Sequence, residues 1–131
     1  MTRLGFRLAR LLEPVTPIEP VSLDVRWRAE GNLLRVHLTG EIDLSTAGRI
    51  DQVEDAYLHS RCRDVELDLS RVTFCDCAGL EHLVRIYEQA ARRGGRARLC
   101  EVPGEVHRLL WMTRGTHPWP VPSTPPAGPL P

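Results

Sequence analysis

The chain contains no lysine, and arginine supplies all 17 of its basic residues. This absence excludes two kinds of chemistry, because a Walker-type phosphate-binding loop and a Schiff-base enzyme both require a lysine. An arginine cannot take over the nucleophilic role of lysine, since its guanidinium stays protonated in proteins.

The chain also lacks a net charge and long apolar runs. Its 17 acidic residues balance the basic ones, so the sequence does not predict the basic surface typical of nucleic-acid binding. The apolar runs are a few residues long, whereas roughly 20 residues are needed to cross a bilayer. Arginines interrupt the N-terminal segment, which excludes the apolar core of a signal peptide. We therefore expect a cytoplasmic protein with no membrane span and no nucleic-acid partner.

Cysteine is scarce, with four residues at Cys62, Cys75, Cys77 and Cys100. In a cytoplasmic chain we expect reduced thiols and no disulfide framework. A zinc site would favour cysteine pairs two residues apart, and the spacing of Cys75 and Cys77 does not fit that pattern. We therefore expect no bound metal and no cofactor.

Motifs of common enzymes are absent as well. The sequence contains no G-x-S-x-G, no H-E-x-x-H and no glycine-rich dinucleotide loop. Its five histidines are scattered, and the carboxylates of Glu41 and Asp43 have no positioned partner for acid–base catalysis. The sequence therefore predicts a protein that is not an enzyme and has no catalytic residues.

Proline marks the two ends of a central domain. Seven of the eleven prolines follow Arg114, and such a segment cannot bury enough apolar surface to offset the entropy lost on ordering. Three more prolines lie between residues 14 and 20. We therefore predict a flexible arm over residues 1–20, a domain over residues 21–115 and a disordered proline-rich tail over residues 116–131.

Within the domain, apolar residues recur with the periods of strands and helices. Strand patterns cover residues 21–27, 34–38, 65–69 and 97–102, and helix patterns cover residues 47–57, 78–91 and 104–110. The predicted inner faces of the first two helices are Ala47, Ile50, Val53 and Tyr57, and Ala78, Leu80, Leu83, Val84, Tyr87 and Ala91. The Gly31-Asn32 turn makes the first two strands antiparallel, and helical crossovers make the last three parallel. The predicted fold is α/β, a mixed sheet of four to five strands with helices packed mainly on one face. The second helix should begin between Asp76 and Gly79.

Two segments carry the most specific motifs. Residues 38–47 read LTGEIDLSTA, and residues 67–80 read LDLSRVTFCDCAGL. Together they resemble the STAS family, named for sulfate transporters and anti-sigma-factor antagonists. Members of that family carry G-E-x-D-x-x-[ST]-A in the first segment and D-L-S-x-[VL]-x-F-x-D-S-[SA]-G-L in the second. The resemblance covers residues 21–115, with the motifs in order and at the expected spacing.

The resemblance implies a regulatory, protein-binding role. Antagonists of this family bind a histidine-kinase-like anti-sigma factor in a partner-switching pathway, and the kinase phosphorylates the serine that follows the motif aspartate. Phosphate adds negative charge beside that aspartate, which dissolves the complex. The implied partner-binding residues are Glu41, Asp43, Leu44, Ser45, Thr46, Asp76, Cys77, Ala78 and Gly79.

The sequence departs from the family at residue 77, where Cys77 replaces the phosphoacceptor serine. A thiol is not a substrate for a Ser/Thr kinase of this kind, so the residue is a degenerate phosphoacceptor position. Cys77 can be a redox switch or a neutral replacement for serine. The alternative function is a STAS sensor domain that binds a small ligand or responds to thiol oxidation.

Overall fold

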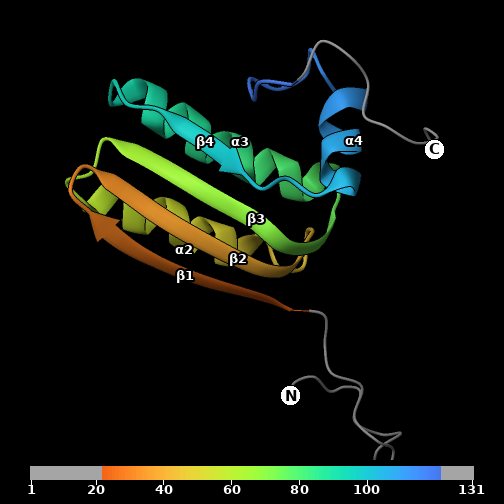
Figure 1. Cartoon of the computed structure of the whole chain (residues 1–131), viewed down its shortest axis with the longest axis horizontal. Coiled ribbons are helices and arrows are strands. Elements are labelled where there is room, and N and C mark those ends of the chain that lie inside the picture. The colour runs from red at the N-terminus through yellow and green to blue at the C-terminus, as the bar shows by residue number, and fades with distance from the viewer. Residues whose placement is uncertain (1–21, 122–131) are drawn as a thin grey trace, which may run out of the picture.

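A computed structural model describes residues 22–121 of the chain. Its four strands form one sheet in the order β1 (Leu23–Glu30), β2 (Leu33–Ile42), β3 (Asp64–Cys75) and β4 (Ala97–Cys100). The helices are α2 (Ala47–His59), α3 (Cys77–Arg92) and α4 (Gly104–Met112). Strand β1 is antiparallel to β2, whereas β2, β3 and β4 are parallel. The predicted element order and the mixed sheet are confirmed (Figure 1).

The β1–β2 hairpin turns at Gly31, whose φ of 62° lies in the left-handed region that glycine adopts without steric cost. Beyond the turn, Leu34, Val36 and Leu38 alternate with polar residues and are almost completely buried. This alternation places one face of β2 in the core and leaves the other face polar, as the period of two residues in the sequence predicts.

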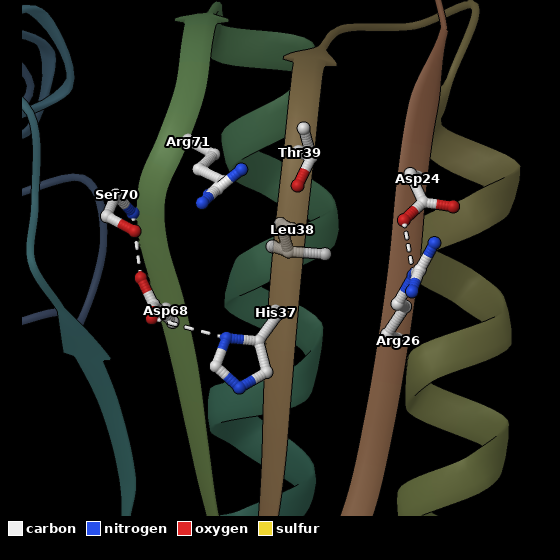
Figure 2. Close-up of a pocket in the computed structure, with 8 residues that line it drawn as sticks. All are labelled: Asp24, Arg26, His37, Leu38, Thr39, Asp68, Ser70 and Arg71. Atoms are coloured by element: carbon white, nitrogen blue, oxygen red, sulfur yellow. Dashed lines mark hydrogen bonds and ion pairs between the residues drawn. The ribbon is translucent and has the colours of Figure 1, made fainter.

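Helices α2 and α3 cover a single face of the sheet, on the side away from the charged residues drawn in Figure 2. Helix α2 buries the predicted residues Ala47, Ile50, Val53 and Tyr57. On α3 the buried face differs from the predicted one, because Ile86 and Ala90 are buried while Ala91 is exposed. The predicted position Tyr87 is only half-buried, and its ring packs against Trp119.

The opposite face of the sheet carries charged side chains that pair across the strands. Glu66 on β3 is 7% exposed and accepts hydrogen bonds from Arg35 on β2, at 2.9 Å, and from Arg98 on β4. Hydrogen bonding to the Cys100 thiol and to Arg98 keeps the pKa of Glu66 below its usual range despite burial. These pairs satisfy the buried carboxylate, which would be costly to bury alone.

The packed domain extends further than predicted at its C-terminal end. Trp119 is 3% exposed and meets Tyr87 edge-to-face, with ring centroids 4.9 Å apart. The Trp119 amide donates to His117 Nδ1 at 3.1 Å, and His117 Nε2 lies 3.0 Å from the Leu110 carbonyl oxygen. The predicted boundary after residue 115 is therefore too early, because a buried tryptophan holds residues 117–121 against α3 and α4.

Residues 1–21 and 122–131, which include the predicted arm, lie outside the described residues.

Two truncations test this corrected boundary. A chain ending at Gly115 should lose about 3–5 kcal/mol of unfolding free energy, because removing Trp119 leaves a cavity beside Tyr87. A chain ending at Val121 should stay within about 0.5 kcal/mol of the full chain. Urea denaturation followed by circular dichroism measures both, and equal stability of the two truncated chains would show that Trp119 contributes nothing to the core.

Candidate functional site

The two motif segments meet at one edge of the sheet. Because β2 and β3 are parallel, their carboxyl ends lie side by side, and Ile42 is the pairing partner of Cys75. The Asp76 amide then donates to the Ile42 carbonyl at 3.2 Å. The loop after β2 and the first turn of α3 are therefore neighbours, although 32 residues lie between Asp43 and Asp76 in the sequence.

Asp76 caps the N-terminus of α3. Its backbone is extended, and its carboxylate accepts a hydrogen bond from the Gly79 amide at 2.8 Å. This bond satisfies one of the amides that a helix N-terminus leaves without a partner. The helix begins at Cys77, which confirms the start predicted between Asp76 and Gly79.

Gly79 allows α3 to approach β2 closely. A Cβ atom at this position would lie 2.6 Å from Ile42 Cγ2 and closer still to the Ile42 carbonyl oxygen. No side chain fits in that space, so only glycine permits this contact. Gly79 is buried, which makes it a support for the site and not part of its surface.

Hydrogen bonds fix the loop between β2 and α2. The Asp43 carboxylate accepts from the Ser45 hydroxyl at 2.7 Å, from the Ser45 amide at 2.9 Å and from the Thr46 amide at 3.1 Å. The Ser45 hydroxyl and these amides hold the pKa of Asp43 below its usual range. Thr46 is 5% exposed, donates to the Glu41 carbonyl at 2.7 Å and accepts from the Asp43 amide at 3.0 Å. The loop is thus ordered without help from a partner.

All nine residues predicted to bind a partner lie at this edge of the sheet, and they differ in exposure. Leu44, Ser45 and Cys77 are exposed, Glu41, Asp43, Asp76 and Ala78 are half-buried, and Thr46 and Gly79 are buried. The accessible groups therefore form the surface, and the two buried residues hold its two halves in place. We call the seven accessible residues the edge surface.

Phe74 was not among the predicted residues, but it is accessible at the same edge of the sheet, and we add it to the edge surface. Its side chain is 44% exposed, and it pairs with Glu41 across the strands. Strand β3 continues to Cys75, beyond the predicted end at residue 69, and its pairing with β2 shifts register after His37 and again after Gly40. Register shifts of this kind redirect side chains at the ends of strands. The motif phenylalanine itself was the sequence signal that could have identified the position.

The four cysteines are free thiols in different environments. Cys62 is buried, Cys75 and Cys100 are half-buried, and Cys77 is exposed on the edge surface. Burial raises the pKa of Cys75 to about 12, with a smaller contribution from the Asp76 charge. Burial and a hydrogen bond to Glu66 raise the pKa of Cys100 to about 11. Over residues 22–121, no group of histidine, cysteine and acidic side chains could hold a metal ion.

A separate hollow of about 600 Å³ lies on the open face of the sheet (Figure 2). Its charged groups largely pair with one another, since His37 Nδ1 lies 3.3 Å from Asp68 and Arg26 Nε lies 3.0 Å from Asp24. The Ser70 amide, which donates to Asp68, keeps the pKa of Asp68 below its usual range. A small ligand entering this hollow would have to compete with those pairs.

Comparisons with known proteins agree with the motifs. A family model described as "Mlab, STAS domain" matches residues 25–116. An anti-sigma F factor antagonist of Paenibacillus polymyxa is 30% identical over 94 residues, which cover 71% of this chain and 80% of that protein. None of the helices described is long and apolar enough to cross a membrane.

Solved structures show the same fold. An anti-sigma factor antagonist from Mycobacterium paratuberculosis matches with a TM-score of 0.65 at 25% identity, over 79% of this chain and 89% of that one. The anti-sigma factor antagonist SpoIIAA in its unphosphorylated form matches with a TM-score of 0.61 at 14% identity, over 69% of this chain and 80% of that one. The second likeness is one of fold alone.

The contact between Gly79 and Ile42 can be tested by adding one methyl group. Gly79→Ala should cost about 1–3 kcal/mol of unfolding free energy, because the new Cβ overpacks against β2. Gly48→Ala is the matched control, since nothing lies within 4 Å of the added Cβ in α2. That variant should be neutral or up to about 1 kcal/mol more stable. Chemical denaturation measures both, and a Gly79→Ala variant as stable as the control would contradict the close approach.

Proposed function

The chain belongs to the STAS domain family, and we propose that it is an anti-sigma factor antagonist that binds a histidine-kinase-like anti-sigma factor through the edge surface. On this proposal it acts in the cytoplasm as a regulatory binding protein and not as an enzyme. The relatives from Paenibacillus polymyxa and Mycobacterium paratuberculosis, both described as anti-sigma factor antagonists, support this role.

The main support for the proposal is that the two motif segments lie side by side at one edge of the sheet. The bond from the Asp76 amide to the Ile42 carbonyl joins them. The Asp43 loop and the α3 start are both held by internal hydrogen bonds. A surface that is ordered before binding loses little conformational entropy when a partner docks, which favours affinity.

The cysteine at residue 77 supports the proposal that this chain is not regulated by phosphorylation at that position. Cys77 is exposed at the first position of α3, where the family has its phosphoacceptor serine. The nearby hydroxyls are placed differently, because Thr73 lies in β3 and donates to the Gly40 carbonyl at 3.3 Å, and Ser70 lies in β3 beside Asp68. We propose that the edge surface binds its partner without the phosphate switch.

The alternative function is a sensor that responds to thiol oxidation. The exposure of Cys77 on the edge surface favours it over a small-ligand site in the hollow on the open face, where the charged groups already pair with one another. On this alternative, peroxide should change the affinity for the anti-sigma factor, a reductant should restore it, and Cys77→Ser should abolish the response. If peroxide leaves the affinity for the anti-sigma factor unchanged, the oxidation-sensor function is excluded and the binding function stands.

Substitution of Ala78 tests the binding function. The anti-sigma factor is first identified by pull-down from the native host, and its affinity is measured by isothermal titration calorimetry. Ala78→Arg should weaken binding about 30-fold or more, because a bulky charge enters the first turn of α3. Ala91→Arg is the matched control on the same helix, where the alanine is exposed and distant from Asp76 in sequence. Equal affinity of the two variants would contradict the proposed surface.

Phosphorylation provides a separate test of residue 77. Incubation with ATP and the cognate anti-sigma factor should add no phosphate to the native chain, and Cys77→Ser should gain one, because Asp76 and Gly79 still present the acceptor position. Intact mass spectrometry measures both. Stoichiometric phosphate at Thr73 or Ser70 of the native chain would show that the switch has moved to another residue.

A further inference from the structure

Large apolar side chains are exposed at five positions among residues 22–121. These are Trp27, Leu44, Leu58, Phe74 and Met112. Single exposed apolar residues are ordinary on protein surfaces, so each alone indicates nothing. Leu44 and Phe74 are different because they lie in the two segments that meet at the edge surface.

Leu44 is 74% exposed and therefore the most accessible of the five. It lies between Asp43 and Ser45, whose side chains hydrogen-bond to each other at 2.7 Å and fix the loop. The loop thus presents a leucine to solvent on an ordered backbone. An apolar anchor of this kind loses little backbone entropy on binding.

Phe74 is presented in the same region by β3. The second register shift between β2 and β3 precedes the pairing of Glu41 with Phe74, and the next pair, Ile42 with Cys75, returns to the buried side. Phe74 is 44% exposed and lies three residues before Cys77. The two apolar side chains therefore belong to the segments on either side of the bond between the Asp76 amide and the Ile42 carbonyl.

Three acidic side chains lie in the two segments that carry Leu44 and Phe74. Glu41, Asp43 and Asp76 form no ion pair with any arginine in the described part of the chain. Hydrogen bonds from Ser45 and Thr46 favour the ionised form of Asp43. A complementary partner must offer apolar area at the centre and positive charge around it.

We infer that Leu44 and Phe74 are the apolar anchors of the edge surface and insert into an apolar cleft of the anti-sigma factor whose rim carries arginine or lysine. The inference rests on the proposed function, since it names the chemistry of the same partner. Anchors of this type contribute most of the affinity when water is excluded around them, and the acidic groups contribute mainly to orientation and association rate.

The experiment measures binding of the full chain to the anti-sigma factor captured from the host. Leu44→Ser and Phe74→Ser should each weaken binding about 30-fold or more, as loss of a hot-spot side chain does. The matched controls are Leu58→Ser and Trp27→Ser, which remove exposed apolar side chains outside the two segments and should change affinity by no more than about 2-fold. Thermal unfolding confirms that all four variants are folded.

The dependence of affinity on salt concentration distinguishes the contribution of the apolar anchors from that of the acidic groups. Glu41→Gln should reduce the loss of affinity that added salt causes, because one charge fewer faces the basic rim. Leu44→Ser and Phe74→Ser should weaken binding without changing that salt dependence. Unchanged salt dependence in Glu41→Gln would contradict the basic rim.

The outcomes distinguish this inference from the proposed function. If Ala78→Arg abolishes binding while Leu44→Ser and Phe74→Ser bind like the native chain, the anchors are wrong and the function stands. If the native chain binds no anti-sigma factor, both are overturned. If the free chain is a dimer by analytical ultracentrifugation and Leu44→Ser or Phe74→Ser makes it monomeric, the occupant is a second copy, which also overturns the inference.

Discussion

The edge surface depends on one close contact, the approach of α3 to the carboxyl end of β2. Gly79 makes the contact possible because any side chain would collide with Ile42. The Asp76 amide makes it specific by donating to the Ile42 carbonyl, while the Asp76 carboxylate caps the helix through the Gly79 amide. Parallel pairing of β2 and β3 makes the two segments neighbours, and these three residues fix the start of α3 against the end of β2.

At this edge of the sheet, buried residues hold the backbone in place, and accessible residues form the surface that a partner can contact. Thr46 and Gly79 are conspicuous in the motifs and lie beneath the surface, where they fix the loop and the helix. Leu44 and Phe74 lie outside any catalytic pattern and present apolar area to solvent. Because the loop and the helix start are ordered without a partner, binding needs little rearrangement. This order before binding is in keeping with the proposed recognition of another protein.

Periodicity in the sequence was sufficient to predict the order of strands and helices, the start of α3 and the buried positions of α2. These features depend on local spacing of apolar residues and on a capping aspartate, which the chain displays directly. The extension of β3 to Cys75 was not predictable in this way, because register shifts break the alternation after Leu69. Trp119 was missed for a different reason, since the surrounding prolines indicated a tail and its contact with Tyr87 is long-range. Exposure of Phe74 likewise depends on pairing between strands that no local pattern records, and burial of Thr46 depends on the loop that its hydrogen bond to the Glu41 carbonyl closes.

The proposed function requires both motif segments to contact the same partner at once. Hydrogen–deuterium exchange of the chain, alone and with its anti-sigma factor, tests this claim most directly because it measures amide protection along the whole sequence. Exchange should be slower in the complex over residues 41–46 and over residues 74–80, with little change around His37 on the open face of the sheet. Protection confined to one of the two segments, or centred on the open face, would contradict it.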